Sequence, residues 1–361
     1  MADGAASRRL VVREIVRETA DACSIVLDPP DGADFSYRPG QFLTLRLPTG
    51  SGAVGRCYSL CSSPHVDDHL RIAVKRVLDG AGSNWINDTL AVGDEVECLA
   101  PGGVFTPRSL DEDLLLFAGG SGITPVLSIL KSALAVGTGR VVLVYANQHE
   151  ASVMFASQLC ELAEHHPDRL HVLHWLESVQ GRPTRPLLRA FIAPYSSYTA
   201  LLCGPSPFME TVTHALRDCG VPPARIHIEK FQSLMEDPFA MSAPIVAAEA
   251  GGETTHLEVE LDGETHEYQW PRQQKLLDFL LAQGLKAPYS CRQGACSACA
   301  CILDDGEVAM LHNEILEPED LDEGYVLGCQ SVPLTDKVKI RAGRALRLPG
   351  VRRRSGRRSR R

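Results

Sequence analysis

Four cysteines in the last third of the chain have the spacing of metal ligands. Cys291, Cys296 and Cys299 form the pattern C-x4-C-x2-C, and Cys329 follows 30 positions after Cys299. This is the plant-type spacing of a [2Fe–2S] cluster, which four cysteine thiolates hold. A structural zinc site is the alternative, but zinc usually takes paired C-x2-C ligands. The spacing therefore predicts an iron–sulfur cluster, and with it electron transfer, at this loop.

The residues around these ligands support that interpretation. Small residues separate the first three cysteines, so the loop can close and its backbone N–H groups can face the sulfides: Gly294, Ala295, Ser297 and Ala298. Cys301 follows two positions after Cys299, and on an alternating strand it would point to the opposite face from Ala300, so we predict a packing role. The other cysteines are expected to be small buried residues: Cys23, Cys57, Cys61, Cys98, Cys160, Cys203 and Cys219.

A second motif, R-x-Y-S at Arg56-Cys57-Tyr58-Ser59, has the chemistry of a flavin site. Arg56 can bind the pyrophosphate of FAD, and the ring of Tyr58 can lie along the flavin. The Ser59 hydroxyl can hydrogen-bond the flavin edge where hydride arrives, and we assign it a catalytic role. Alone, such a motif also fits a strand that carries an Arg–Tyr pair on its surface.

The expected partner of this motif comes about 25 residues later, as G-x-G-S at residues 80–83. Gly80 and Gly82 let the backbone approach a phosphate closely, and Ser83 and nearby N–H groups can bind it. Val74 and Lys75 precede this loop and belong to the same predicted site. The two motifs together predict FAD.

Nicotinamide signals occupy two further turns. The sequence Gly119-Gly120-Ser121-Gly122 follows an apolar strand and precedes a helix, where a pyrophosphate meets a helix N-terminus. We expect Thr124 to cap that helix and Pro125 to be its first residue. The second turn, C-G-P at residues 203–205, leaves room for the nicotinamide ring and adds Cys203, Gly204 and Pro205 to the predicted site.

The choice between NADH and NADPH depends on the residues after the next strand, which read Asn147-Gln148-His149-Glu150. A 2′-phosphate would require a nearby Arg or Lys. None is present, and Glu150 would repel a phosphate. We therefore predict NADH, with Asn147 among the cofactor-binding residues.

Three kinds of domain must position these motifs. Short strands punctuated by Pro and Gly fill residues 8–108 and predict a closed antiparallel β-barrel for FAD. Strands alternate with helices over 109–235, which predicts a doubly wound parallel sheet for NAD. A linker at 236–253 precedes an iron–sulfur domain at 254–343, which begins with a hairpin around Asp262-Gly263. Residues 344–361 are predicted to be a disordered Arg-rich tail.

Composition and charge indicate the compartment and the kinds of partner to expect. The net charge is −9, and the tail alone contributes +9 through nine Arg residues, so the rest of the chain carries −18. No stretch approaches the ~20 uninterrupted apolar residues of a membrane span. The N-terminus lacks the apolar run of a signal peptide, so we expect a cytoplasmic protein. The tail is either a solvated extension or a segment that docks an acidic partner, a membrane surface or nucleic acid, although we do not expect nucleic acid as a partner.

The order R-x-Y-S, G-G-S-G-I-T-P, C-G-P and C-x4-C-x2-C…C resembles the family of ferredoxin–NAD(P) reductase-like oxygenase reductases with a C-terminal plant-type ferredoxin domain. Residues 56–63, 145–147, 173–177 and 320–324 are most similar to the reductase components of 3-ketosteroid 9α-hydroxylases. The resemblance covers about residues 10–343. It implies FAD, NADH, a [2Fe–2S] cluster, a β-grasp fold for the last domain and a Rieske-type oxygenase as partner. The Arg-rich tail is not part of the family pattern.

By the same resemblance, Glu229-Lys230-Phe231 matches the E-x-F sequence of the family. Phe231 is then expected to cover the flavin ring and Glu229 to lie near the nicotinamide, both as catalytic residues. NADH supplies two electrons and the cluster takes one, so the predicted route runs from NADH to FAD, then singly to the cluster and the oxygenase. Two other functions stay open: a reductase for an acyl-CoA desaturase or diiron hydroxylase, and a non-catalytic iron–sulfur binding module.

Overall fold

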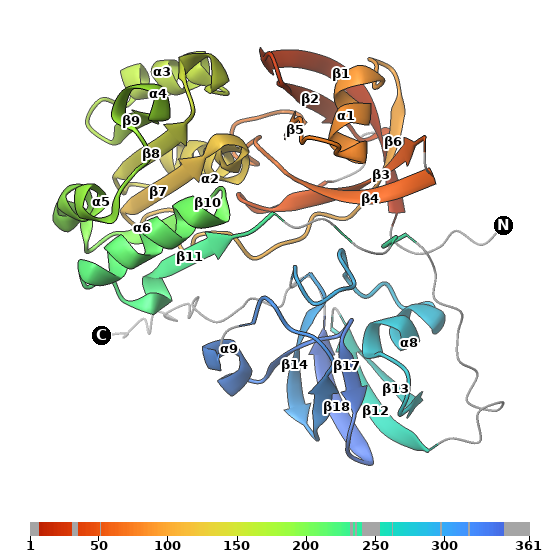
Figure 1. The fold of residues 1–361 in the computed structure, drawn as a ribbon. Coiled ribbons are helices and arrows are strands. Elements are labelled where there is room, and N and C mark those ends of the chain that lie inside the picture. Colours follow the sequence, from red (N-terminus) through yellow and green to blue (C-terminus); the bar gives the residue numbers. More distant parts are fainter. Residues whose placement is uncertain are drawn as a thin grey trace, which may run out of the picture. The chain divides into compact units, whose positions relative to one another are not determined.

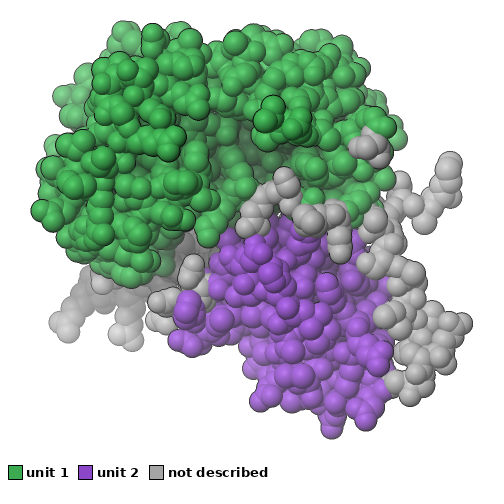
Figure 2. Space-filling view, in the orientation of Figure 1, with its two compact units in different colours: residues 1–241 green, residues 242–361 purple. Residues whose placement is uncertain are grey.

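In a computed structural model, the chain forms two compact units, residues 1–241 and 242–361 (Figure 2). The structure describes residues 7–30, 35–50, 52–231, 234, 237–239, 253–261, 263–296, 298–316 and 318–342. Most of the predicted linker, together with Asp262, Ser297 and the whole Arg-rich tail, therefore lies outside the described residues. Within the described part of the chain, no helix is long and apolar enough to cross a membrane.

The first half of unit 1 is a curled antiparallel sheet (Figure 1). Its strand order is β4-β3-β6-β1-β2-β5, and Leu60, directly after β4, bridges to Ile72 of β5, which closes the sheet on itself. The predicted antiparallel barrel is thus confirmed. The strands are β1 (Ser7–Thr19), β2 (Ala22–Asp28), β3 (Phe42–Thr49), β4 (Gly52–Ser59), β5 (Leu70–Lys75) and β6 (Glu95–Leu99).

One element of this barrel was not predicted. The G-x-G-S segment, expected to be a phosphate-binding loop, opens the helix α1 (Ala81–Asp88), with Gly80 as its N-cap residue. The alternating strand pattern of the neighbouring sequence contains no 3.6-residue period that would signal so short a helix.

The second half of unit 1 is a parallel sheet of order β11-β10-β7-β8-β9, and the predicted doubly wound architecture is confirmed (Figure 1). Helices α2 and α3 pack on one face, and α5 and α6 pack on the other. The elements are β7 (Leu114–Gly119), α2 (Ile123–Val136), β8 (Val141–Asn147), α3 (Ala156–His165), β9 (Leu170–Leu176), α4 (Glu177–Gln180), α5 (Arg185–Ile192), β10 (Thr199–Cys203), α6 (Ser206–Asp218) and β11 (Ile226–Glu229).

The start of α2 differs from the prediction. Gly122 is the N-cap residue, and the helix begins at Ile123, so Thr124 and Pro125 lie inside the first turn. The Thr124 hydroxyl donates a hydrogen bond back to the Ser121 carbonyl at 3.1 Å instead of capping the helix. Proline is still well placed there, because the first-turn N–H groups have no partner within a helix.

Unit 2 is a five-stranded mixed sheet of order β13-β12-β18-β14-β16, with α8 packed in its core and a small second sheet of β15 and β17 (Figure 1). The hairpin predicted around residues 262–263 is present, with Leu261 opposite Glu264. The elements are β12 (Thr254–Leu261), β13 (Glu264–Pro271), α8 (Leu276–Ala282), β14 (Ala300–Asp305), β15 (Val308–Met310), α9 (Pro318–Asp322), β16 (Tyr325–Leu327), β17 (Ser331–Pro333) and β18 (Lys337–Ala342).

Candidate functional site

The two predicted flavin motifs meet at the start of α1. Side chains alternate along a strand, so Arg56 and Tyr58 share one face of β4. A Cβ atom at Gly82 would lie 3.0 Å from Arg56 Cγ and 3.2 Å from the Tyr58 hydroxyl oxygen. The glycine therefore leaves space that any larger residue would fill, directly between the two motifs, and this cradle fits the phosphate end of a dinucleotide.

The remaining predicted flavin residues take different positions around this cradle. Ser59 is 4% exposed, and burial raises the pKa of the Tyr58 phenol, which stays a hydrogen-bond donor at neutral pH. Val74 is different, because its side chain lies in the barrel core and only its backbone can reach a ligand. The Lys75 ammonium lies 3.5 Å from the Asp21 carboxylate.

Ser83 and Cys57 also have protein contacts. The Ser83 hydroxyl accepts a hydrogen bond from the Val77 N–H at 3.1 Å and donates one to the Gly80 carbonyl at 3.3 Å. It therefore fixes the turn before α1. Cys57 is half-buried, with its sulfur 3.4 Å from the Thr44 hydroxyl oxygen. The expectation of burial was wrong for Cys160, which is exposed on α3.

The nucleotide motifs also pack against each other, at the carboxyl ends of the adjacent strands β7 and β10. A Cβ atom at Gly122 would lie 2.1 Å from the Cys203 carbonyl oxygen, and one at Gly119 would lie 2.8 Å from Pro205 Cδ. Gly120 adopts a φ of +53°, which favours glycine. Ligands of doubly wound sheets bind where neighbouring strands send their connections to opposite faces, and β7 and β10 form that point here.

Asn147, at the end of β8, supports a ligand at this edge. Its side chain is 8% exposed, and both amide atoms are buried without a hydrogen-bond partner among the described residues. A buried amide without partners costs roughly 1–3 kcal/mol, which a bound polar ligand would offset. Tyr145, which was not among the predicted cofactor-binding residues, fixes the loop by donating its hydroxyl hydrogen to the Gly120 carbonyl at 3.2 Å.

Glu229 and Phe231 complete the edge at the end of β11. Glu229 lies opposite Cys203 in the β10–β11 register. Burial raises the pKa of the Glu229 carboxyl to about 8, and burial together with the Glu229 charge raises the pKa of the Cys203 thiol. Both groups are thus mainly protonated at neutral pH and able to donate. Phe231 is 51% exposed, as are several other large apolar residues, so its ring is accessible to a ligand.

The four predicted cluster ligands are all buried, and they lie in two pairs. The Cys291 N–H donates to Cys296 Sγ at 3.3 Å, and the Cys329 N–H donates to Cys299 Sγ at 3.4 Å. In the described part of the chain, no group of three or more His, Cys, Asp and Glu side chains is placed to hold a metal ion. Two pairs of cysteines suit a binuclear cluster, because each of its two irons would take two thiolates.

The electrostatics of the loop favour thiolates at Cys291 and Cys329. A hydrogen bond from Cys296 and backbone N–H groups at Gln293, Ala295 and Gly294 lower the pKa of Cys291 to about 6. A hydrogen bond from Cys299 lowers the pKa of Cys329 in the same way. These N–H groups would equally stabilise a negatively charged cluster.

Gly294 and Gln330 shape this loop. Gly294 has a φ of +80°, and a Cβ atom there would lie 2.7 Å from the His312 carbonyl oxygen. Gln330 was not among the predicted site residues, although it directly follows the predicted ligand Cys329. Its amide nitrogen lies 2.9 Å from the Arg292 carbonyl oxygen and 3.7 Å from Cys329 Sγ.

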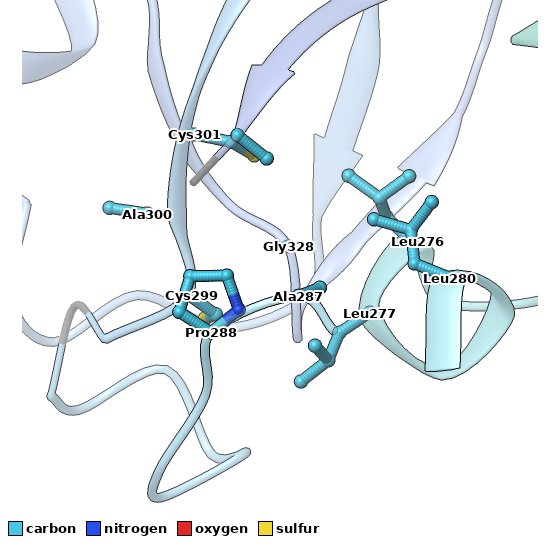
Figure 3. Close-up of a pocket in the computed structure, with 10 residues that line it drawn as sticks. Leu276, Leu277, Leu280, Ala287, Pro288, Cys299, Ala300, Cys301 and Gly328 are labelled. Carbon is cyan, nitrogen blue, oxygen red and sulfur yellow. The ribbon is translucent and has the colours of Figure 1, made fainter. Parts of the chain in front are cut away.

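Cys301 lies in the apolar core of unit 2, as predicted. Its side chain is 1% exposed and donates to the Val326 carbonyl at 3.6 Å. Figure 3 shows Cys299 and Cys301 among apolar side chains of α8 and the cysteine loop, including Leu277 and Ala287. This apolar lining shields the back of the cysteine loop from water.

Three family models match successive parts of the chain. They are an oxidoreductase FAD-binding domain at residues 9–106, an oxidoreductase NAD-binding domain at 116–214 and a 2Fe-2S iron-sulfur cluster binding domain at 259–334. The predicted cofactor classes are therefore confirmed.

Similar proteins extend over nearly the whole chain. The 3-ketosteroid-9-alpha-monooxygenase ferredoxin reductase component of Rhodococcus rhodochrous is 56% identical over 93% of this chain and 97% of its own length. The protein of that name from Mycolicibacterium smegmatis is 53% identical over 92% of this chain and 96% of its own. The solved structure of phthalate dioxygenase reductase is 24% identical, with a TM-score of 0.55. The match covers 93% of this chain and 98% of that one, so it supports the three-domain fold.

Proposed function

Since the chain belongs to the family of ferredoxin reductase components of 3-ketosteroid-9-alpha-monooxygenase, we propose that it supplies electrons from NADH to a Rieske-type oxygenase that hydroxylates a 3-ketosteroid at C9. The chain itself is an oxidoreductase with FAD, NAD and 2Fe-2S domains. The identity of 56% across 93% of the chain carries the steroid assignment.

We assign the cofactors to the residues that the sequence predicted. When bound, FAD accepts the hydride of NADH and releases electrons singly, which a [2Fe–2S] centre requires. Cys291, Cys296, Cys299 and Cys329 hold the cluster. FAD is held by Arg56, Cys57, Tyr58, Ser59, the Val74 backbone, Lys75, Gly80, Gly82 and Ser83. NADH is held by Gly119, Gly120, Ser121, Gly122, Thr124, Asn147, Cys203, Gly204 and Pro205.

The residues around the reacting atoms orient the two rings and exclude water. Ser59 is almost fully buried and offers a hydroxyl at the flavin edge. Glu229 and Cys203 present protonated groups to the nicotinamide, because burial raises the pKa of each. Phe231 stacks on the flavin, which accounts for an apolar ring that is otherwise 51% exposed.

NADH rather than NADPH is the proposed donor. The residues that follow β8, from Gln148 to Glu150, are exposed and include no Lys or Arg. Glu150 is the first residue of a short 3-10 helix there, and its carboxylate would repel a 2′-phosphate.

We further propose a cytoplasmic protein with domains at residues 8–108, 109–235 and 254–343, joined by a linker at 236–253. The tail at 344–361 then docks an acidic surface. Support comes from the charge distribution, because the nine Arg residues of the tail contribute +9 while the rest of the chain has a net charge of −18. Such docking would weaken as salt rises, because exposed charges are screened beyond about 10 Å at 0.1 M ionic strength.

A reconstituted assay tests the function. The full chain is mixed with NADH, the oxygenase component of a 3-ketosteroid 9α-hydroxylase and 4-androstene-3,17-dione, and the 9α-hydroxylated steroid is quantified. We expect product with the natural chain and none with Cys329→Ser, whose flavin should still be reduced by NADH. If NADH reduces flavin and cluster but no product forms, the steroid assignment is wrong, and acyl-CoA desaturases and diiron hydroxylases become the partners to test.

A further inference from the structure

A buried polar seam joins the flavin barrel to the helix of the nucleotide loop. On the barrel side it begins three residues after Ser59, where the R-x-Y-S strand continues into a loop. On the other side it lies along α2, the helix that starts directly after the Gly119–Gly122 turn. The seam consists of Ser62, Ser63 and Asp67 in the loop, and of Ser128, Lys131 and Ser132 on α2.

Three direct contacts cross this seam. The Ser128 hydroxyl donates to the Ser62 carbonyl at 2.5 Å, and the hydroxyl oxygens of Ser63 and Ser132 lie 2.7 Å apart. All four serines are at most 1% exposed. The third contact is an ion pair between the Lys131 ammonium and the Asp67 carboxylate, also at 2.5 Å.

The ion pair is tied into the loop that carries it. Lys131 has a side chain that is 7% exposed, and Asp67 also accepts a hydrogen bond from the Ser63 N–H. A charge buried to this extent is costly unless it is paired and hydrogen-bonded, so the position of Lys131 depends on that of Asp67. The loop is fixed to the barrel in turn, because the Ser62 hydroxyl accepts from Tyr37 at 2.7 Å and from the Arg71 N–H at 3.0 Å.

Apolar packing surrounds the seam. Cys61, the residue before it, packs in the same cluster as Ile129 and Leu130 of α2. Apolar contacts are non-directional, so they hold the helix against the barrel without fixing individual atoms at set distances. Hydrogen bonds and buried ion pairs have required distances and angles, so the seam fixes one position of α2 against the barrel.

We propose that Lys131 and the seam serines are positioning residues for hydride transfer. This inference depends on the proposed function, because the seam connects the strand assigned to the flavin edge with the helix assigned to the NADH pyrophosphate. A displacement of about 1 Å between reacting atoms costs roughly a hundredfold in rate. Loss of the seam should therefore slow hydride transfer while each cofactor keeps its own contacts.

The test compares Lys131→Met and the double variant Ser128→Ala/Ser132→Ala with the natural full-length protein. Flavin reduction by NADH is followed by anaerobic stopped-flow absorbance, with NADH and with NADH deuterated at the transferred position. We expect the limiting rate to fall about 10- to 100-fold. The NADH concentration for half-maximal rate, the FAD content and the flavin spectrum should stay unchanged, and the deuterium isotope effect should rise.

Arg9→Met is the matched control. It removes another ion pair of unit 1, with Glu95, in which the two side chains are 73% and 53% exposed. It should leave the limiting rate unchanged. If Lys131→Met does not fold, the serine double variant decides the question alone.

The outcomes separate this inference from the proposed function. Folded seam variants that bind FAD and reduce it within about twofold of the natural rate would overturn the positioning role. A slower rate explained wholly by weaker NADH binding would overturn it too. If the natural protein itself binds FAD but is not reduced by NADH, the proposed function fails instead.

Discussion

Gly122 should be among the residues least tolerant of a single added methyl group. Its φ of −62° and ψ of −9° are allowed for any residue, so Gly122→Ala introduces no backbone strain. Gly122 is the N-cap residue of α2, where glycine is preferred to alanine by about 1 kcal/mol. A larger loss on substitution must therefore come from contact, and the structure gives that contact a size.

The new Cβ atom would lie 2.1 Å from the Cys203 carbonyl oxygen and 2.4 Å from its carbon, where ordinary van der Waals contact begins at 3.4 Å. The two nucleotide turns must separate by about 1 Å to accommodate it. Because both neighbouring atoms belong to the backbone, no side-chain rotation relieves the overlap. A shift of this size at a reacting centre costs about a hundredfold, or roughly 2.7 kcal/mol of transition-state stabilisation.

The assay is steady-state reduction of ferricyanide by NADH, with FAD content and thermal midpoint measured on the same preparation. We expect kcat/KM for NADH to fall about a hundredfold in Gly122→Ala while FAD stays bound. Gly50→Ala is the control, because a Cβ atom at Gly50 meets nothing within 4 Å. A folded Gly122→Ala protein with kcat/KM within about threefold of the natural protein would refute the reasoning.

Four other changes test separate parts of the site. Cys301→Ser should keep the 2Fe–2S absorbance and cost about 1–2 kcal/mol of unfolding free energy, measured by denaturant titration, because a hydroxyl enters an apolar core. Phe231→Ala should speed the loss of FAD on gel filtration without changing the thermal midpoint of the FAD-free protein, since the ring is 51% exposed. The raised Glu229 pKa stabilises the fold below pH 4.5, and this contribution is lost as pH rises through about 8, so the thermal midpoint should fall between pH 5 and 8 more steeply than in Glu229→Gln. Removal of residues 344–361 should leave NADH-to-dye turnover unchanged, because the tail lies outside every predicted cofactor motif, and a large drop in the flavin reduction rate would contradict this.

The sequence predicted those parts of the molecule that depend on short-range pattern. Alternating strands, βα units and the cysteine spacing each follow from local chemistry, and the barrel, the parallel sheet and the cluster loop were recognised from them. The buried pairing of Cys291 with Cys296 and of Cys299 with Cys329 agrees with the spacing, although the pairing itself is a three-dimensional result.

Tertiary contacts decided the features that were missed. Helix α1 has only eight residues, and Gly82 sits at its start because Arg56 and Tyr58 occupy the space beside it. Thr124 has a typical capping side chain, yet the close approach of Gly122 to Cys203 fixes the helix start two residues earlier. Neither contact is visible in a local pattern, since Gly82 follows Arg56 by 26 positions and Tyr58 by 24, and Cys203 follows Gly122 by 81.

Three glycines show how such contacts define a site more sharply than motif matching does. Taken singly, a glycine in a loop signals only a turn. Three glycines differ, because a Cβ atom at each would overlap a segment that is distant in the sequence. At Gly82 the overlap is with the Arg56 side chain, at Gly122 with the Cys203 backbone, and at Gly294 with the His312 carbonyl. Each glycine thus allows two distant segments to approach within the reach of one ligand. That close approach, rather than the letters of the motif, makes each loop a candidate cofactor site.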